Sequence, residues 1–305
     1  MSRVLSLAER QRMLALLPEP WCNAAYEFSV LPSESNDNFL LSAEGMASLV
    51  LRIAKADAQS LGVNRNLEQT LYGWAANIGL SPELLWVDKQ RGVMLSRYCA
   101  DDVAAHDSDA FIRSLAEQLA RLHSVPHKEL PFHVHGRCIF DHTSTYKKLL
   151  MENSVGQSLQ LTSTIHSALE FAQKCWPGMS EAQCLCHSDL HRDNILFHEG
   201  RVFFLDWEYT AITPAILDIA SLAQSYAWNE QQLQSFYSCY LSAKAIPDNA
   251  HSEHFSRLIR ELPVARFLLA LQSYYWSLLH YSEGKQACEY FDILELEAGR
   301  LLAIM

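Results

Sequence analysis

Hydrophobic and polar residues alternate along several short stretches of the first hundred positions, which is typical of half-buried strands. Over residues 49–54 this alternation places Leu49, Leu51 and Ile53 on one face of a strand and Arg52 on the opposite face. An arginine within a strand can lie on a solvated edge or in a functional site, and the pattern alone leaves both interpretations open.

The rest of the N-terminal pattern predicts further strands and two helical segments. A helical segment is expected over residues 5–17, followed by a strand at 38–41, a helix at 64–79 and a hairpin over 84–98. We therefore expect a small α+β lobe, rich in strands, at residues 1–98.

Beyond this lobe the pattern becomes helical. Apolar residues recur at helical spacing between residues 112 and 122, and Pro126 ends this segment, which is followed by a loop-like stretch at 131–145. Further helices are expected near residues 146–175, 215–228, 230–244, 252–282 and 286–304. The sequence thus predicts an α+β fold in which a connector around residues 96–100 leads to a large, mainly helical lobe at 99–305.

One hairpin interrupts the helical pattern. Two apolar runs on either side of a two-residue turn predict a β-hairpin over residues 195–205. Such a turn pairs positions whose numbers sum to 399, so Asn194 lies opposite Leu205 and one residue away from Asp206. Because Mg²⁺ prefers hard oxygen ligands, Asn194 and Asp206 are candidate metal ligands.

A polar loop precedes the hairpin and contains further chemically active side chains. His187 and Asp189 lie before Asn194, in the arrangement of a catalytic loop followed by a metal-binding hairpin. A metallohydrolase is an alternative, because His187, Asp189, His191 and Asp193 alternate and could place four ligands on one side of a strand. That alternative leaves Asn194 and the whole first lobe without a function.

Composition and charge limit the classes of partner. The chain has 305 residues, 49% of them hydrophobic, which is enough for a sizeable core. Its formal net charge of -11, with no cluster of Lys and Arg, argues against a nucleic-acid partner and is compatible with a cationic small molecule. No apolar run has the length of a signal or membrane-spanning segment, so we expect a cytoplasmic protein, either monomer or homodimer.

Histidines and cysteines give weaker signals. His127, His133, His135 and His142 lie close together in the sequence, but no Cys or carboxylate accompanies them at ligand spacing, so a metal site there is disfavoured. The eight cysteines show no repeated metal spacing, and free thiols are the simplest interpretation in a reducing compartment.

Three short motifs follow one another in the order of a known family. They are His187-x-Asp189-x4-Asn194, Asp206-Trp207-Glu208-Tyr209 and Ile216-Leu217-Asp218-Ile219-Ala220, and Leu122-His123-Ser124 precedes them. Together they resemble the aminoglycoside phosphotransferase and choline kinase superfamily over residues 31–276, closest to its choline and thiamine kinase branches. The resemblance implies a protein-kinase-like bilobal fold and phosphoryl transfer from ATP, with Mg²⁺, to a hydroxyl group of a small, cationic molecule.

The resemblance also implies catalytic and metal-binding roles. Asp189 would orient the attacking hydroxyl and accept its proton, while His187 would brace the loop. Asp218 would accept hydrogen bonds from backbone N–H groups of that loop. Asn194 and Asp206 would hold Mg²⁺.

For the nucleotide, the resemblance gives Arg52 the position of the strand lysine that contacts the phosphates, with Glu68 as its ion-pair partner. The connector residues Ser96, Arg97 and Tyr98 would offer backbone hydrogen bonds to adenine. Arginine keeps the positive charge of lysine but differs from it in shape and hydration.

The substrate residues implied by the resemblance are Glu208, Trp207 and Trp276. Aromatic side chains can belong to the core or form a wall that attracts a cation. Where choline kinases carry a second tryptophan and an acid, this chain has Ser273 and Ser225. Thiamine or another amino alcohol is therefore favoured over choline, with aminoglycosides and other metabolites as alternatives.

Two further alternatives concern the activity itself. A protein kinase is disfavoured, because only eleven residues separate Asp206 from Asp218, too few for a peptide-docking segment. A catalytically silent binding protein is conceivable, because the expected phosphate-covering turn at residues 33–38 contains no glycine.

Overall fold

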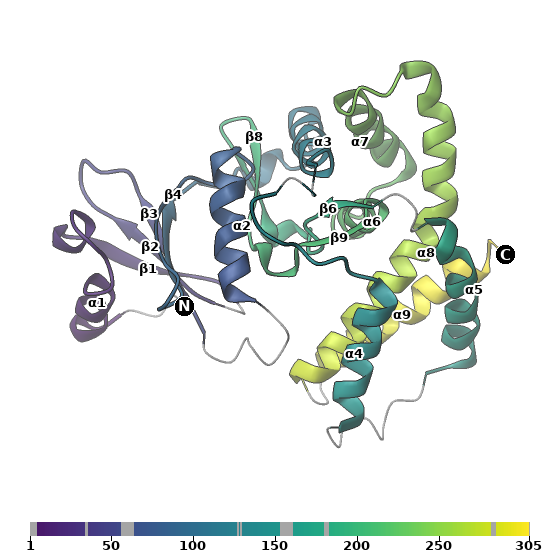
Figure 1. Cartoon of the computed structure of the whole chain (residues 1–305), viewed down its shortest axis with the longest axis horizontal. Coiled ribbons are helices and arrows are strands. Elements are labelled where there is room, and N and C mark those ends of the chain that lie inside the picture. Colours follow the sequence, from purple (N-terminus) through teal and green to yellow (C-terminus); the bar gives the residue numbers. More distant parts are fainter. Residues whose placement is uncertain are drawn as a thin grey trace. The chain divides into compact units, whose positions relative to one another are not determined.

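A computed structural model describes residues 5–33, 36–55, 64–126, 128, 130–152, 161–179, 183–281 and 285–304 (Figure 1). The chain forms two compact units. Unit 1 comprises Met1–Ser114 and Asp193–Tyr209, and unit 2 comprises Leu115–Arg192 and Thr210–Met305. Within the described residues, no helix combines the length and apolar character needed to cross a membrane.

Unit 1 is built on a five-stranded antiparallel sheet with the strand order β1-β2-β3-β5-β4. Its strands are β1 (Glu27–Leu31), β2 (Asn36–Ser42), β3 (Leu49–Ala54), β4 (Leu84–Asp88) and β5 (Val93–Arg97). Leu51 lies between Phe39 and Leu95 in the register, and all three are buried. The predicted alternation in β3 is confirmed, since Leu49 and Leu51 are buried whereas Arg52 lies on the other face.

The helices of unit 1 include two α-helices that begin at side-chain caps. The two are α1 (Leu7–Leu14) and α2 (Arg65–Asn77), and the unit also contains the short 3-10 helices η1 (Trp21–Asn23), η3 (Val103–Ala105) and η7 (Trp207–Tyr209). The Asn64 side chain accepts a hydrogen bond from the Leu67 N–H, which satisfies a backbone donor at the start of α2. The helix then buries Glu68 and Leu71 on one face, so a carboxylate is carried into the interior of the unit.

The predicted hairpin is confirmed as β7 (Ile195–His198) and β8 (Arg201–Phe204). Ile195 pairs with Phe204, and the Leu205 N–H donates to the Asn194 carbonyl over 2.9 Å, in the register expected from the sequence. Two left-handed residues, at φ 50° and 78°, form the turn. The structure groups this hairpin with unit 1, whereas the sequence assigned it to the helical lobe; the lobe boundary at residue 98 stays a prediction.

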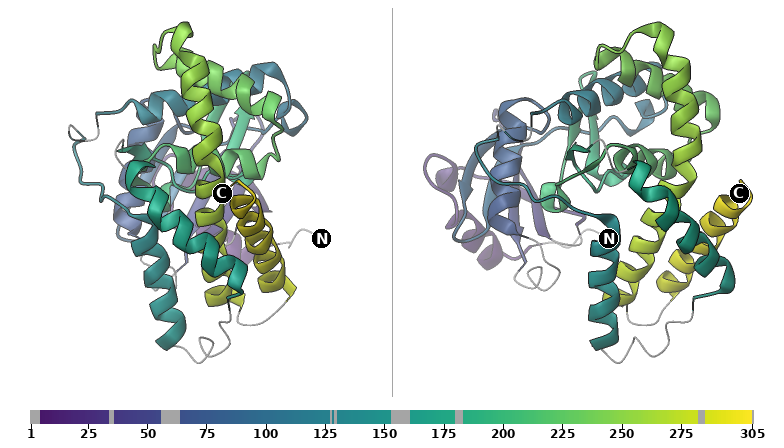
Figure 2. Two further views of the ribbon diagram at one scale, coloured as in Figure 1. Left: turned by 90° about the vertical axis from the view of Figure 1, so that its right-hand side faces the viewer. Right: turned by 45° about the vertical axis from the view of Figure 1, so that its right-hand side comes forward.

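Unit 2 contains one short strand pair and most of the helices. Its elements are β6 (Gln183–Cys186), β9 (Ala211–Pro214), α4 (Ile139–Glu152), α5 (Ser163–Met179), α6 (Ile216–Ser225), α7 (Glu230–Ala243), α8 (Asp248–Tyr281) and α9 (Lys285–Leu302), while α3 (Asp109–His123) and η6 (Arg192–Asn194) span the division between units. The long helix α8 packs against α4, α5, α6, α7 and α9 (Figure 2). The expected α+β class, with a strand-rich region followed by a helical one, is confirmed.

Two helix predictions were wrong in extent. The helix expected over residues 146–175 is two helices, α4 and α5, and the second begins where Thr162 Oγ1 accepts the Ile165 N–H. Part of the expected loop at 131–145 is helical, because α4 already begins at Ile139. The polar cap at Thr162 starts the second helix, and periodicity alone did not show this start.

Candidate active site

The polar loop of unit 2 follows β6, and side chains of α6 hold it through hydrogen bonds. The fully buried Asp218 lies in the first turn of α6, where its carboxylate accepts the His187 N–H over 2.9 Å and the Ser188 N–H over 2.8 Å. Ser188 adopts a left-handed φ of 66°, so these two bonds hold an unusual backbone turn immediately before Asp189. The predicted contact of Asp218 with backbone N–H groups of this loop is confirmed.

Asp218 also contacts a buried histidine that sequence reasoning had left without a role. His123, at the end of α3, donates from Nε2 to Asp218 Oδ2 over 3.0 Å, and its Nδ1 is hydrogen-bonded to the Tyr240 hydroxyl over 2.9 Å. Burial alone would raise the pKa of Asp218, but the hydrogen bond and charge of His123 outweigh it and lower this pKa. Asp218 is thus an ionised anchor for the loop.

Asp189 itself lies at the surface of the loop. Its side chain is 33% exposed, and His191 Nε2 lies 3.6 Å from its Oδ2. His187, by contrast, is fully buried, which fits a bracing position. Further along, the Ser221 hydroxyl donates to the Leu190 carbonyl over 2.8 Å, so α6 holds the loop on both sides of Asp189.

Unit 1 gathers a second set of charged side chains. Arg52 Nη2 contacts Glu68 Oε1 and lies 3.1 Å from Asp206 Oδ1. The predicted ion pair between Arg52 and Glu68 is therefore confirmed. Arg65 joins them, because its Nη1 donates to Glu68 Oε2 over 2.9 Å and to Glu208 Oε2 over 3.0 Å. We call these five side chains the unit 1 charge cluster.

The unit 1 charge cluster contains more acidic side chains than basic ones. Glu68, Asp206 and Glu208 present oxygen atoms within 4.8 Å of one another, and two arginines face these three carboxylates. Burial, reinforced by Asp206 and Glu68, raises the pKa of Glu208 from its ordinary 4.5 to about 8. Burial opposes the charge of Arg52, yet the carboxylates outweigh it and raise the pKa of Arg52, which stays protonated.

The donor set of this region fits a hard divalent cation. Mg²⁺ takes oxygen ligands, and the cluster supplies closely spaced carboxylates whose mutual repulsion a cation would relieve. Asn194 is buried at the start of the hairpin, and its backbone pairs with Leu205, next to Asp206. Metal binding by Asn194 and Asp206 stays a prediction, to which the structure adds Glu208 and Glu68 as neighbouring acids.

The metallohydrolase alternative and the histidine-rich stretch gain no support. Among the described residues, two groups of potential ligands come together, and neither includes His187, Asp189, His191 or Asp193. The second group is His123, Cys184 and Cys186, in which both ring nitrogens of His123 already have hydrogen-bond partners. Neither group contains His133, His135 or His142, and His127 lies outside the described residues.

The predicted adenine contacts require a correction. Ser96 and Arg97 belong to β5 rather than to a connector. The Arg97 N–H donates to the Glu83 carbonyl over 2.9 Å, and the Tyr98 N–H donates to the Ser48 carbonyl over 3.0 Å. These two donors are thus engaged within unit 1. Of the predicted phosphate turn, residues 34–35 lie outside the described residues.

The predicted substrate residues belong to different units. Trp207 is fully buried in unit 1, where its Nε1 donates to Ser81 Oγ over 2.7 Å and its ring packs edge-on against Trp74. Its assignment to the substrate was therefore wrong, because a fully buried core side chain offers no surface. Glu208 belongs to the unit 1 charge cluster, and Trp276 is half-buried on α8. The sequence motif did not indicate that Trp207 would be buried in the core while its neighbours Asp206 and Glu208 join the charge cluster.

Comparisons with known proteins bear on the family and the fold of this chain. The profile of the phosphotransferase enzyme family matches residues 27–255. Protein LicA of Haemophilus influenzae is 26% identical over 267 residues, covering 86% of this chain and 76% of LicA. The fold resembles a choline/ethanolamine kinase family protein from Mesorhizobium loti, with a TM-score of 0.74, 20% identity and coverage of 98% and 94% of the two chains. It also resembles LicA in complex with AMP, with a TM-score of 0.69, 17% identity and coverage of 98% and 99%. The kinase-like fold expected from the resemblance is confirmed.

Proposed function

Because this chain belongs to the phosphotransferase enzyme family and is a small-molecule kinase, we propose that it transfers the γ-phosphoryl group of ATP to a hydroxyl group. The observation that carries this proposal is the anchoring of the loop by Asp218. Two backbone hydrogen bonds to a buried, ionised carboxylate hold the turn directly before the partly exposed Asp189. Such a fixed and accessible carboxylate suits a group that positions an acceptor.

Asp189 is the proposed acceptor-side catalytic residue. Its partial exposure leaves it accessible to a solute, and a carboxylate can orient a hydroxyl group and take up its proton as the oxygen attacks phosphorus. His187 supports this loop from its buried position and has no proposed contact with the substrate.

The unit 1 charge cluster is the proposed site for the phosphates and their cation. Arg52 is a half-buried, permanently charged group held by two carboxylates, which suits contact with phosphate oxygens. Asn194 and Asp206 would hold Mg²⁺, which neutralises the charge of the phosphates during transfer. That the similar LicA structure contains AMP supports the use of an adenine nucleotide.

For the acceptor we propose a small amino alcohol. The related protein from Mesorhizobium loti is named a choline/ethanolamine kinase family protein, which supports an acceptor of this general kind. The half-buried Trp276 on α8 offers an aromatic surface for an amine or a thiazolium ring. Thiamine, choline and other amino alcohols are all compatible with these observations.

The test is an ADP-release assay with Mg-ATP over thiamine, choline, ethanolamine, homoserine, methylthioribose and aminoglycosides. Asp189→Ala should lower turnover by about 10²–10⁴-fold while leaving Mg-ATP affinity unchanged. Asp206→Asn, which suits the left-handed φ of 60° at this position, should instead weaken Mg-ATP binding by about tenfold or more. Asp193→Ala removes an exposed acid four residues from Asp189 and serves as the control.

The outcomes separate the alternatives. Wild-type turnover by Asp189→Ala would refute its catalytic role. Absence of turnover with every acceptor, together with no ATP binding by calorimetry, would favour a catalytically silent scaffold.

A further inference from the structure

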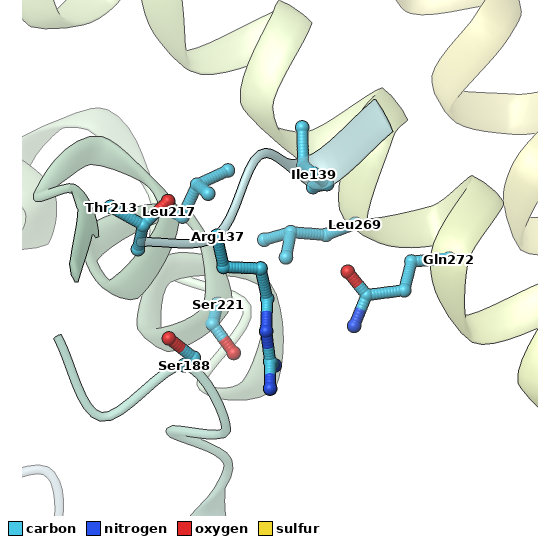
Figure 3. Close-up of a pocket in the computed structure, with 8 residues that line it drawn as sticks. All are labelled: Arg137, Ile139, Ser188, Thr213, Leu217, Ser221, Leu269 and Gln272. Carbon is cyan, nitrogen blue, oxygen red and sulfur yellow. The ribbon is translucent and has the colours of Figure 1, made fainter. Parts of the chain in front are cut away.

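A pocket opens in unit 2 beside the loop that carries Asp189 (Figure 3). The space between its lining residues amounts to about 360 Å³ when the part open to solvent is included. It is lined by Arg137, Ile139, Ser188, Thr213, Leu217, Ser221, Leu269 and Gln272. Ser188, which lines the pocket, directly precedes the proposed catalytic residue Asp189 in the sequence.

The charge of the pocket is positive. Of its eight lining residues, Arg137 alone is ionisable. Its side chain extends through the pocket, with Ser188 and Ser221 on one side and Gln272 on the other (Figure 3). The backbone of Arg137 is held in place, because its N–H donates to the Ile212 carbonyl over 2.9 Å. A guanidinium at this position repels an ammonium group and attracts an anion.

Hydroxyl groups complete the polar side of the pocket. Thr213 is 2% exposed, and its Oγ1 has no hydrogen-bond partner among the described residues. Ser188 Oγ is buried and likewise lacks a partner among them. Both hydroxyls can donate, and an unsatisfied buried hydroxyl is costly, so both favour a ligand that accepts hydrogen bonds.

The surroundings of Gln272 add no second positive charge. Burial, together with the charge of Arg137, lowers the pKa of His142 to about 4, although its hydrogen bond with Gln272 opposes this shift. His142 is therefore neutral near pH 7. The guanidinium fork of Arg137 and nearby neutral donors form a set suited to a planar carboxylate.

We propose that this pocket binds a carboxylate or similar anionic group of the phosphate acceptor. The acceptor would then be a small hydroxylated acid, such as an amino alcohol that also carries a carboxylate, rather than choline or thiamine. Ile139, Leu217 and Leu269 would contact its carbon chain. This inference rests on the proposed phosphotransferase function and narrows the class of substrate.

Matched acceptor pairs test the inference directly. Serine carries a carboxylate that ethanolamine lacks, and homoserine carries one that 3-aminopropan-1-ol lacks. Glycerate has a carboxylate in place of one hydroxymethyl group of glycerol. We expect the kcat/KM for the acid to exceed that for its partner by about tenfold or more, as for a charge-assisted bidentate contact. Choline and thiamine, which lack a carboxylate, should be poor acceptors in the same assay.

Variants identify the residue responsible. Arg137→Gln should abolish the preference by raising the KM for the acid, and Arg137→Lys should restore only part of it because lysine lacks the planar fork. Thr213→Val keeps the shape and charge of the pocket, and should raise the same KM a few-fold. Lys148→Gln removes an equal charge from an exposed position on α4 and serves as the control. Thermal unfolding of each variant reports whether it is folded. If Arg137→Gln does not fold, the KM of Thr213→Val for the acid tests the subsite instead.

The possible results distinguish the two proposals. Phosphorylation of the amines as well as the acids, or a preference for acids that survives in Arg137→Gln, would overturn the anionic subsite but leave the phosphotransferase function standing. If no acceptor is phosphorylated, the binding of these acids, measured by thermal unfolding, tests the anionic subsite. A rise in unfolding temperature with millimolar serine, homoserine or glycerate that is lost in Arg137→Gln would support the subsite, and no rise would overturn it.

Discussion

Two buried carboxylates, one in each unit, show opposite responses to burial. The pKa of Asp218 in unit 2 is lowered, whereas the pKa of Glu208 in unit 1 is raised to about 8. Asp218 accepts two backbone N–H groups and a histidine N–H. Glu208 has Arg65 as its partner but shares its site with two other acids. The difference lies in the neighbours, because both side chains are withdrawn from water.

This contrast separates an anchor from a binding site. The charge of Asp218 is balanced by donors from its own unit, so its loop is held without any ligand. With all three carboxylates ionised, the acids of the unit 1 charge cluster would exceed the two arginines by one formal charge, and the raised pKa of Glu208 means that a bound proton removes this surplus below about pH 8. Such a surplus costs stability until a cation joins it, which is the property expected of a metal site.

The largest effect should come from removing the anchor. Asp218→Ala leaves two backbone N–H groups and His123 without their buried acceptor, and we expect a loss of about 3–5 kcal/mol in the free energy of unfolding. Urea denaturation measures this loss. Glu253→Ala, which removes an exposed acid of α8, provides the control. An unchanged urea midpoint in Asp218→Ala would show that the loop does not depend on this carboxylate.

The surplus of acids in unit 1 should appear as a pH dependence. Between pH 4.5 and about 8 the folded state retains the Glu208 proton that the unfolded state loses, so the stability contributed by this group falls as the pH rises. Glu208→Gln should remove this part of the slope and make the protein more stable than wild type near pH 8. Thermal unfolding at several pH values is the measurement. Identical slopes in both proteins would contradict the raised pKa and the contrast with Asp218.

A smaller effect is expected at the outer end of the anchor. Tyr240→Phe removes the hydroxyl that is hydrogen-bonded to His123 Nδ1, at a cost of about 1 kcal/mol. If His123 transmits this contact to Asp218, kcat should fall while the affinity for Mg-ATP stays constant. Chemical denaturation and steady-state kinetics together test this. A change in Mg-ATP affinity alone would place the effect in unit 1 and would argue against the separation of roles.

The sequence by itself determined those features that depend on local spacing. The hairpin register that places Asn194 opposite Leu205 and the inward face of β3 both agree with prediction. Strand alternation and two-residue turns act over a few positions, so their geometry can be read from the chain. The ion pair of Arg52 with Glu68 and the loop contacts of Asp218 were available only through family resemblance, because the partners lie sixteen and about thirty positions apart.

Tertiary structure alone decided which side chains share a site. Arg65 and Glu208 are 143 positions apart, and nothing in the local pattern of either predicted their contact. Trp207 lies within the motif Asp-Trp-Glu-Tyr, yet its ring is in the core, while the neighbouring acids Asp206 and Glu208 belong to the unit 1 charge cluster. Arg137 was an unremarked residue of a loop until packing placed it in a pocket with Ser188. Burial and charge balance are properties of the surroundings, and the surroundings come from distant parts of the chain.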